Sequence, residues 1–228
     1  TVNTSTLPDT PAQRKPAAGR AEQHSTRLLF LLAGFSAAAW ASLVPVAKAA
    51  TGVNEGQLGL VLLCLGIGSL LAMPVSGVVS TRHGCRKVLM VCGVALCACL
   101  PLLASVQNVF TLAAALFFFG AMIGTFDCVM NIQAVIVERD SKRPLMSGFH
   151  GFYSLGGLLG AATTSTIMDL GVSPFATVSA IALAGVLLLM GIRRHVLPYG
   201  NPAEGPPFAL PRERFRSEER RVGKECRS

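Results

Sequence analysis

The sequence predicts an all-α membrane protein whose chain crosses the bilayer six times. Two observations predict this class: six apolar stretches follow one another, and basic residues occupy every second connection between them. An α-helix rises about 1.5 Å per residue, so roughly 20 apolar residues cross a hydrocarbon layer about 30 Å thick with each backbone amide paired inside the helix. The predicted spans are residues 28–47, 58–79, 88–106, 109–137, 145–168 and 175–192.

The first apolar stretch could instead be a secretory signal peptide. Arg27, the apolar run after it and the Ala-rich end at 47–50 imitate the three regions of such a peptide. A signal peptide has a shorter apolar region and is not followed by five more spans, so we assign residues 28–47 to a transmembrane helix. Pro45 in this span and Pro74 in the second are typical of bent helices that move against one another.

The basic residues predict the side on which each connection lies. Short loops rich in Lys and Arg stay on the cytoplasmic side, because these side chains resist translocation. The connections after the first, third and fifth spans contain one basic residue between them, Lys48. The other flanks contain Arg14, Lys15, Arg20, Arg27, Arg82, Arg86, Lys87, Arg139, Lys142, Arg143, Arg193 and Arg194. We therefore expect both termini in the cytoplasm and a multi-pass protein in the inner membrane of a bacterium.

The formal net charge of +8 does not indicate binding to nucleic acid. A nucleic-acid-binding protein presents its basic residues as one continuous patch, whereas here apolar spans separate them. The cysteines lack the paired spacing of metal ligands, and neither a bilayer nor the cytoplasm favours disulfides. We expect them to pack as small apolar residues, with no metal or other cofactor; they are Cys64, Cys85, Cys92, Cys97, Cys99 and Cys128.

Four segments are predicted along the chain. Residues 1–26 are rich in Thr, Pro, Ala and charge, cannot bury enough apolar surface to fold, and are expected to form a flexible cytoplasmic leader. Residues 27–195 form the helix bundle and 196–215 a cytoplasmic linker. Residues 216–228 resemble the translation of a common sequencing adapter, so we interpret them as a non-native tail. A natural charged terminus is the alternative.

The connection after the second span is a short basic turn. Gly77 predicts close approach of two helices, and Gly84 predicts a tight turn. Arg82, Arg86 and Lys87 are expected at the cytoplasmic interface. Mechanically, such a turn is a short latch between two helices.

This turn resembles the signature G-x-x-x-D-R-x-G-R-[RK] of the major facilitator superfamily. Gly77, Arg82, Gly84 and Arg86 match it, whereas Thr81 stands at the position of its Asp and Cys85 at that of the Arg after its second glycine. The resemblance covers about residues 27 to 195 and implies the N-terminal six-helix half of a twelve-helix carrier, built from two inverted three-helix repeats. It also implies that the turn acts in the cytoplasmic gate.

The fourth span carries an acid within its apolar sequence. Gly120, Gly124, Asp127 and Asn131 are spaced by four, three and four, which places them on one stripe of a helix. A charged carboxylate at that depth costs roughly 2.5 to 3.5 kcal/mol unless it is paired, protonated or hydrated, so such a residue usually faces a cavity. An acid exposed alternately to water and to an apolar site can carry a proton. Hydrogen bonding across a helix interface is the alternative role.

Residues 127–131 resemble the fourth helix of fucose-permease-like members of the same superfamily. The resemblance implies that Asp127 couples transport to protons and that Asn131 hydrogen-bonds the substrate. The fifth span is similar to the fifth helix of that group, with His150 at the position of a substrate-binding Gln. We expect His150 to contact substrate or a proton, and Tyr153 and Trp40 to bind substrate. Helix packing is the alternative for these three.

Three other functions are alternatives to transport by a carrier. An intramembrane serine protease needs an activated serine, but Ser154 lacks a G-x-S-x-G elbow and shares its helix with His150. The tripeptide of water channels occurs once, at residues 201–203, outside every span. A scaffold without transport remains open. We expect a carrier that is not an enzyme, with the bilayer, a small polar or sugar-like solute, protons and a second six-helix half as its partners.

Overall fold

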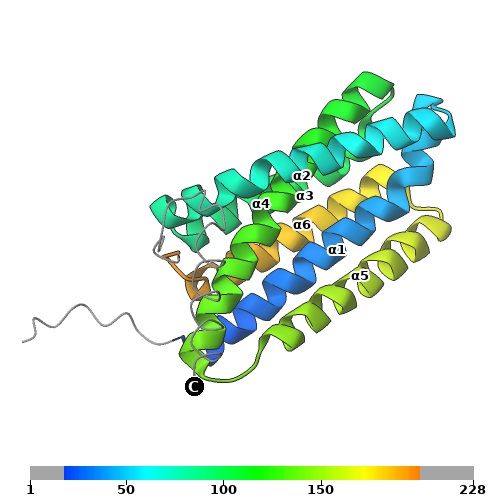
Figure 1. The fold of residues 1–228 in the computed structure, drawn as a ribbon. Coiled ribbons are helices and arrows are strands. Elements are labelled where there is room, and N and C mark those ends of the chain that lie inside the picture. The colour runs from blue at the N-terminus through cyan, green and yellow to red at the C-terminus, as the bar shows by residue number, and fades with distance from the viewer. Residues whose placement is uncertain (1–17, 201–228) are drawn as a thin grey trace, which may run out of the picture.

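The computed structural model describes residues 18–200, which form a bundle of six long helices (Figure 1). The helices are α1 (Arg20–Thr51), α2 (Glu55–His83), α3 (Cys85–Ser105), α4 (Val109–Ser141), α5 (Met146–Asp169) and α6 (Pro174–Ile192), followed by a short 3-10 helix, η1 (Arg193–His195). Each predicted span corresponds to one helix; residues 106 and 145, at the ends of two spans, are the caps of α3 and α5. The first helix begins earlier than expected, so residues 20–26 of the predicted leader are helical; the predicted tail, 216–228, lies outside the described residues.

Five segments in the described part of the chain are long and apolar enough to cross a membrane: α1, α2, α3, α4 and the stretch Pro174–His195. The remaining helix, α5, has 24 residues and is therefore about 36 Å long. Its Gly, Ser and Thr residues lower its hydropathy. The fifth predicted span thus has the length of a transmembrane helix, but its hydropathy is lower than that of the other five.

The helices pack mainly as two crossed pairs, α1 with α5 and α2 with α4, while α3 also lies against α6 (Figure 1). Inverted three-helix repeats predict this arrangement. Each crossed pair joins the first helix of one repeat to the second helix of the other, and α3 and α6 are the third helices. The all-α fold of six helices predicted from the sequence is confirmed.

Both crossings depend on glycines that touch the backbone of the partner helix. At the α1–α5 crossing, a Cβ added to Gly34 would lie under 3.0 Å from the Tyr153 carbonyl oxygen, and one added to Gly156 would meet the Leu31 carbonyl oxygen as closely. The backbones therefore pack without intervening side chains. Close packing of this kind is a main source of helix association in a bilayer, where hydrophobic burial between helices contributes little.

The α2–α4 crossing repeats this construction. A Cβ on Gly68 would collide with the Phe117 carbonyl oxygen, and a Cβ on Gly120 with that of Leu65. In both crossings, one helix places its glycine three residues after a leucine, and the other places its glycine three residues after an aromatic residue. A second glycine follows four residues later, at Gly160 and Gly124. The two pairs thus share one spacing and one packing mode.

The apolar core has two clusters, one toward each end of the bundle. One contains Phe30, Leu89 and Phe149, and the other contains Trp40 and Phe119. Four cysteines are buried in these clusters, as expected for small apolar residues; they are Cys85, Cys92, Cys97 and Cys99.

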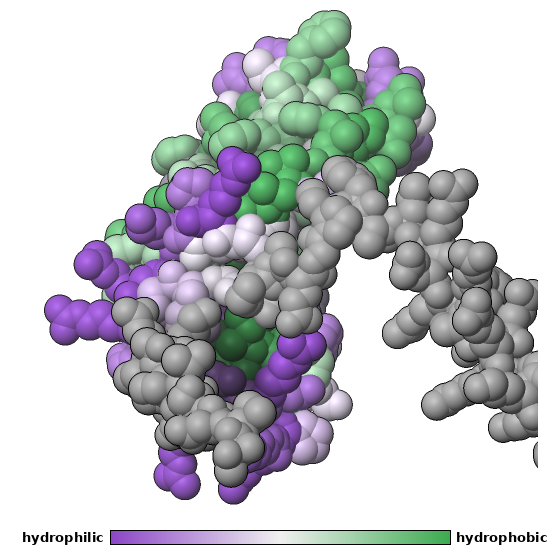
Figure 2. All heavy atoms as spheres, turned by 60° about the vertical axis from the view of Figure 1, so that its left-hand side comes forward, coloured by the Kyte–Doolittle hydropathy of each residue, from purple (hydrophilic) through white to green (hydrophobic). Residues whose placement is uncertain are grey.

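One end of the bundle gathers the start of α1, the α2–α3 turn, the α4–α5 connection and the end of α6. We call it the basic end, because it holds every described Lys and Arg except Lys48. Figure 2, which turns this end forward, shows hydrophilic side chains there and a largely apolar surface beyond them. Lys48 lies at the opposite end, where it forms an ion pair with Glu55. The alternation of basic connections predicted from the sequence is therefore present in three dimensions.

Candidate functional site

Among the described acids, Asp127 lies farthest from the helix ends. It is about 27 Å along α4 from Val109 and about 21 Å from Ser141. Its Oδ1 atom is buried and has no hydrogen-bond partner within residues 18–200. An ionised carboxylate without a partner is unfavourable at this depth, so the site favours a protonated carboxyl or one that meets a group from elsewhere.

Asn131 lies one turn closer to the basic end and borders open space. Its side-chain amide donates to the Asp127 carbonyl oxygen over 2.8 Å, which fixes the side chain along α4. Together with Cys128, Ile132 and Val135 it lines a hollow of about 360 Å³. An amide next to a hollow can hydrogen-bond a solute that enters it.

Tyr153 of α5 is half-buried. The packing of α5 on α1 through Gly34 fixes the Tyr153 backbone. Asp127 and Asn131 lie one turn apart on α4, while Tyr153 lies on α5 at its contact with α1.

His150 is exposed and lies one turn from the start of α5. Its Nδ1 atom is 3.0 Å from the Met146 carbonyl oxygen, and its ring packs edge-on against Phe30, with 5.2 Å between centroids. The Ser154 hydroxyl donates to the backbone carbonyl of His150, not to its ring. A serine nucleophile needs the ring nitrogen of its base within hydrogen-bond reach, so this geometry does not support the protease alternative.

Trp40 lies apart from this group. Its side chain is only 5% exposed, and its ring centroid is 6.3 Å from that of Phe119. It packs in the apolar cluster nearer the end opposite the basic end. The structure therefore places Trp40 in the core between α1 and α4.

The predicted turn after α2 consists of one residue, Gly84. Its φ of 81° lies in the region that favours glycine, and a Cβ there would collide with the Pro198 carbonyl oxygen. The expected tight turn is confirmed. At Gly77, in contrast, no atom lies within 4 Å of an added Cβ. The close helix approach expected there is therefore not made by the described residues.

Arg86 ties the start of α3 to the chain that follows α6. Its Nε donates to the Val196 carbonyl oxygen over 2.8 Å, and a terminal nitrogen donates to that of Arg194 over 2.9 Å. Arg82 and Lys87 remain exposed at the basic end. One arginine thus joins two chain segments at the basic end.

Two further residues stabilise the basic end, and neither was predicted from the sequence. Gln133 is fully buried, donates to Thr26 Oγ1 over 3.0 Å and accepts from the Leu197 amide over 3.2 Å. Glu138 accepts from the first two amides at the start of α5, those of Leu145 and Met146, over 2.7 and 2.6 Å. The only sequence signal for Gln133 was an amide side chain within an apolar span.

The fold and this arrangement define a class of proteins: helical membrane proteins with inverted three-helix repeats and polar side chains at mid-depth. The chain belongs to the Major Facilitator Superfamily, whose family model matches residues 28–222. The superfamily expected from the α2–α3 turn is thereby confirmed.

Three curated relatives are similar to this chain. It is 48% identical over 195 residues to an uncharacterized MFS-type transporter of Yersinia pestis. The aligned region covers 85% of this chain and 51% of that relative. The chain is 34% identical over 160 residues to an uncharacterized transporter of Sinorhizobium fredii, with 69% and 42% covered. The membrane protein MosC of Rhizobium meliloti is 31% identical over 160 residues, with 70% and 39% covered. The chain thus spans about half the length of the first relative and less of the other two.

Proposed function

We propose that this chain is the N-terminal six-helix half of a proton-linked carrier in a bacterial inner membrane. The solute is small and polar, in the sugar-like class, and binds near the midplane between two six-helix halves. The halves rock to open the site to either side in turn. The basic end faces the cytoplasm, because loops rich in Lys and Arg stay on that side. The first relative is about twice as long as the region of it that matches this chain, which supports a second half in the complete carrier.

The observation that carries this proposal is the position of Asp127. A carboxyl whose buried oxygen lacks a partner among the described residues favours its neutral form when the site is dry. When the carrier opens, water can stabilise the charged form, so the acid can take a proton on one side of the membrane and release it on the other. A purely structural acid would be expected to have a hydrogen-bond partner across the helix interface.

The surrounding residues have separate roles in the proposal. Asn131 and Tyr153 hydrogen-bond the solute, in keeping with the hollow at Asn131 and the half-buried position of Tyr153. His150 contacts the solute or relays the proton toward the basic end, where its exposed ring lies. Trp40 acts indirectly, by packing α1 against α4. The resemblance of the fourth and fifth helices to fucose-permease-like carriers supports the sugar-like class.

The gating role of the α2–α3 turn rests on its single-residue link and on Arg86. Because Gly84 alone joins α2 to α3, the ends of these helices stay together at the basic end, and Arg86 extends the connection to the chain after α6. Gly77, Arg82 and Lys87 lie on accessible surfaces at or near the basic end. There they can meet the second half of the carrier when the cytoplasmic side closes.

Transport by the complete carrier tests the proposal. Vesicles containing the two-half protein are given an inward proton gradient and a panel of radiolabelled monosaccharides. We expect Asp127→Asn to abolish accumulation against a gradient but to retain exchange of internal for external sugar. Asp169→Asn, the same substitution at an exposed end of α5, is the matched control and should accumulate normally. Normal accumulation by Asp127→Asn would overturn the coupling role.

A further inference from the structure

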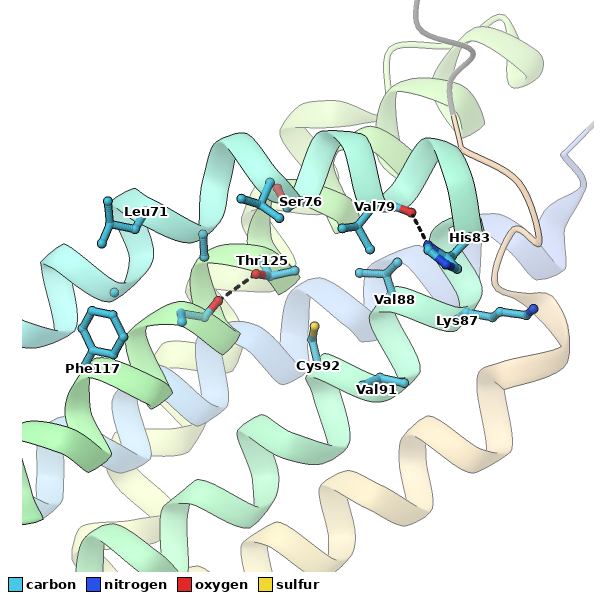
Figure 3. A pocket seen from close by; sticks show the side chains of 14 residues that line it. Leu71, Ser76, Val79, His83, Lys87, Val88, Val91, Cys92, Phe117 and Thr125 are labelled. Atoms are coloured by element: carbon cyan, nitrogen blue, oxygen red, sulfur yellow. Dashed lines mark hydrogen bonds between the residues drawn. The ribbon is translucent and has the colours of Figure 1, made fainter. Parts of the chain in front are cut away.

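A groove between α2, α3 and α4 has no role in the proposed transport site. It has a volume of about 610 Å³, and apolar side chains such as Leu71, Val75, Val91 and Phe117 line most of it (Figure 3). The two hydroxyl groups drawn in the groove are satisfied within their own helices: Ser76 donates to the Met73 carbonyl oxygen and Thr125 to that of Ala121. We call this site the α2–α3 groove.

The α2–α3 groove and Asp127 lie on different sides of α4. Thr125 lines the groove, and successive residues of a helix are rotated by about 100°. Asp127, two residues later, is therefore about 160° away around the α4 axis. The hollow at Asn131 shares no lining residue with the groove. A ligand in the groove would therefore not compete directly with a solute near Asp127.

The groove has the length of one leaflet of a bilayer. It begins at Gly68, near the middle of α2, and ends at His83, the last residue of that helix. These residues are about 22 Å apart along the helix, compared with about 15 Å for half of a hydrocarbon core. The groove therefore runs from the bilayer centre to the interface at the basic end. This is the depth occupied by one acyl chain and the start of its headgroup.

Charge is confined to the interfacial end of the groove. Lys87 and His83 lie there, and the residues that line the groove include no Asp or Glu (Figure 3). His83 Nδ1 is 3.2 Å from the Val79 carbonyl oxygen, which leaves its other ring nitrogen for a further contact. Lys87 is in the first turn of α3, where the helix dipole is also positive. This end favours an anion.

We propose that the α2–α3 groove binds an anionic phospholipid from the leaflet at the basic end. One acyl chain lies along the apolar side chains, and the phosphate meets the Lys87 ammonium and the His83 ring. Basic pockets between transmembrane helices bind anionic headgroups in this way. A zwitterionic lipid can fill the apolar part, but it carries no net charge to match Lys87. The selectivity for negative lipids therefore resides in that lysine.

Fluorescence quenching by brominated lipids tests this site in the complete protein. Val75→Trp places a fluorescent reporter inside the groove, about 12 Å along α2 from His83. The fluorescence of Trp40, which every variant contains, is measured in the parent protein and subtracted. Leu183→Trp on α6 is the matched control, because its position is 61% exposed compared with 59% for Val75. The bilayers contain phosphatidylcholine with either brominated phosphatidylglycerol or brominated phosphatidylcholine at equal mole fractions. Val91→Trp is a second groove reporter if Val75→Trp fails to fold.

We expect brominated phosphatidylglycerol to quench the groove reporter more strongly than brominated phosphatidylcholine, with no such preference at position 183. Lys87→Ala should reduce the preference about five-fold, whereas Lys142→Ala, another exposed lysine of the basic end, should not. Equal quenching by both lipids with Lys87 intact would overturn the proposal. So would the absence of quenching by either lipid, since the second half of the carrier would then cover the groove.

Discussion

The α-carbon of Gly34 lies against the backbone carbonyl oxygen of Tyr153, with no room for a side chain between them. This contact sets the distance between α1 and α5 at Tyr153, a candidate substrate-binding residue. The packing of the two helices and the position of Tyr153 therefore depend on one glycine.

Gly34→Ala should separate α1 from α5 and destabilise the protein by about 1–3 kcal/mol, because an added methyl group overlaps backbone atoms that cannot rotate away. Gly151→Ala is the control, since no atom lies within 4 Å of a Cβ at that position of α5. It should leave stability unchanged or raise it by up to about 1 kcal/mol. Thermal unfolding in detergent measures both. Equal stability of the two variants would contradict the close crossing.

Gln133→Leu should lower stability by about 1–3 kcal/mol, because the Leu197 amide and the Thr26 hydroxyl would lose a buried partner. The exposed Gln107→Leu, in the connection between α3 and α4, is the control and should unfold at the parent temperature. If both variants unfold at that temperature, Gln133 does not join α1, α4 and the chain after α6.

Glu138→Ala should expose the first amides of α5 to solvent. The carboxylate accepts from both Leu145 and Met146, and it complements the positive end of the helix dipole. Hydrogen exchange should become faster at these two amides, and the free energy of unfolding should fall by about 1–2 kcal/mol. Glu138→Gln keeps an acceptor and should show a smaller change. Unchanged exchange in Glu138→Ala would show that another group caps α5.

Thiol labelling in intact cells tests the orientation of the basic end. In the complete carrier, Arg143→Cys should react with a membrane-impermeant maleimide only after permeabilisation. Ala50→Cys, at the opposite end, should react from outside, and the parent chain corrects for native cysteines. The reverse pattern would place the basic end outside the cell.

The sequence predicted the architecture well because bilayer thickness constrains helix length so strongly. Each predicted span corresponds to one helix, and the basic residues share one end as expected. The helix ends were less predictable. Residues 20–26 are helical: Glu22 in the first turn accepts from the Gly19 amide, and Ser25 and Thr26 are buried, Ser25 against the chain after α6.

The residues of the candidate site were selected from the sequence, and their roles stay predictions. Asp127 and Asn131 were selected because polar residues in an apolar span are conspicuous. The sequence did not show that Trp40 packs in the core, whereas Asn131 borders open space. Glu138 could not be found, since an acid seven residues before an uncapped helix is recognisable only once the connection is folded. A close helix contact was expected at Gly77, but the structure makes such contacts at Gly34 and Gly68 instead. Residue spacing does not specify which helix packs against a glycine, so the sequence could not distinguish these positions.

Infrared difference spectroscopy of the protonated carboxyl band tests directly whether Asp127 exchanges a proton, because it needs no known solute. We expect the protein in lipid bilayers to lose a buried carboxyl band between acidic and alkaline buffer. This change should be missing in Asp127→Asn and present in Asp169→Asn. An identical spectral change in all three proteins would show that Asp127 does not exchange a proton, and the carrier would then need another coupling group.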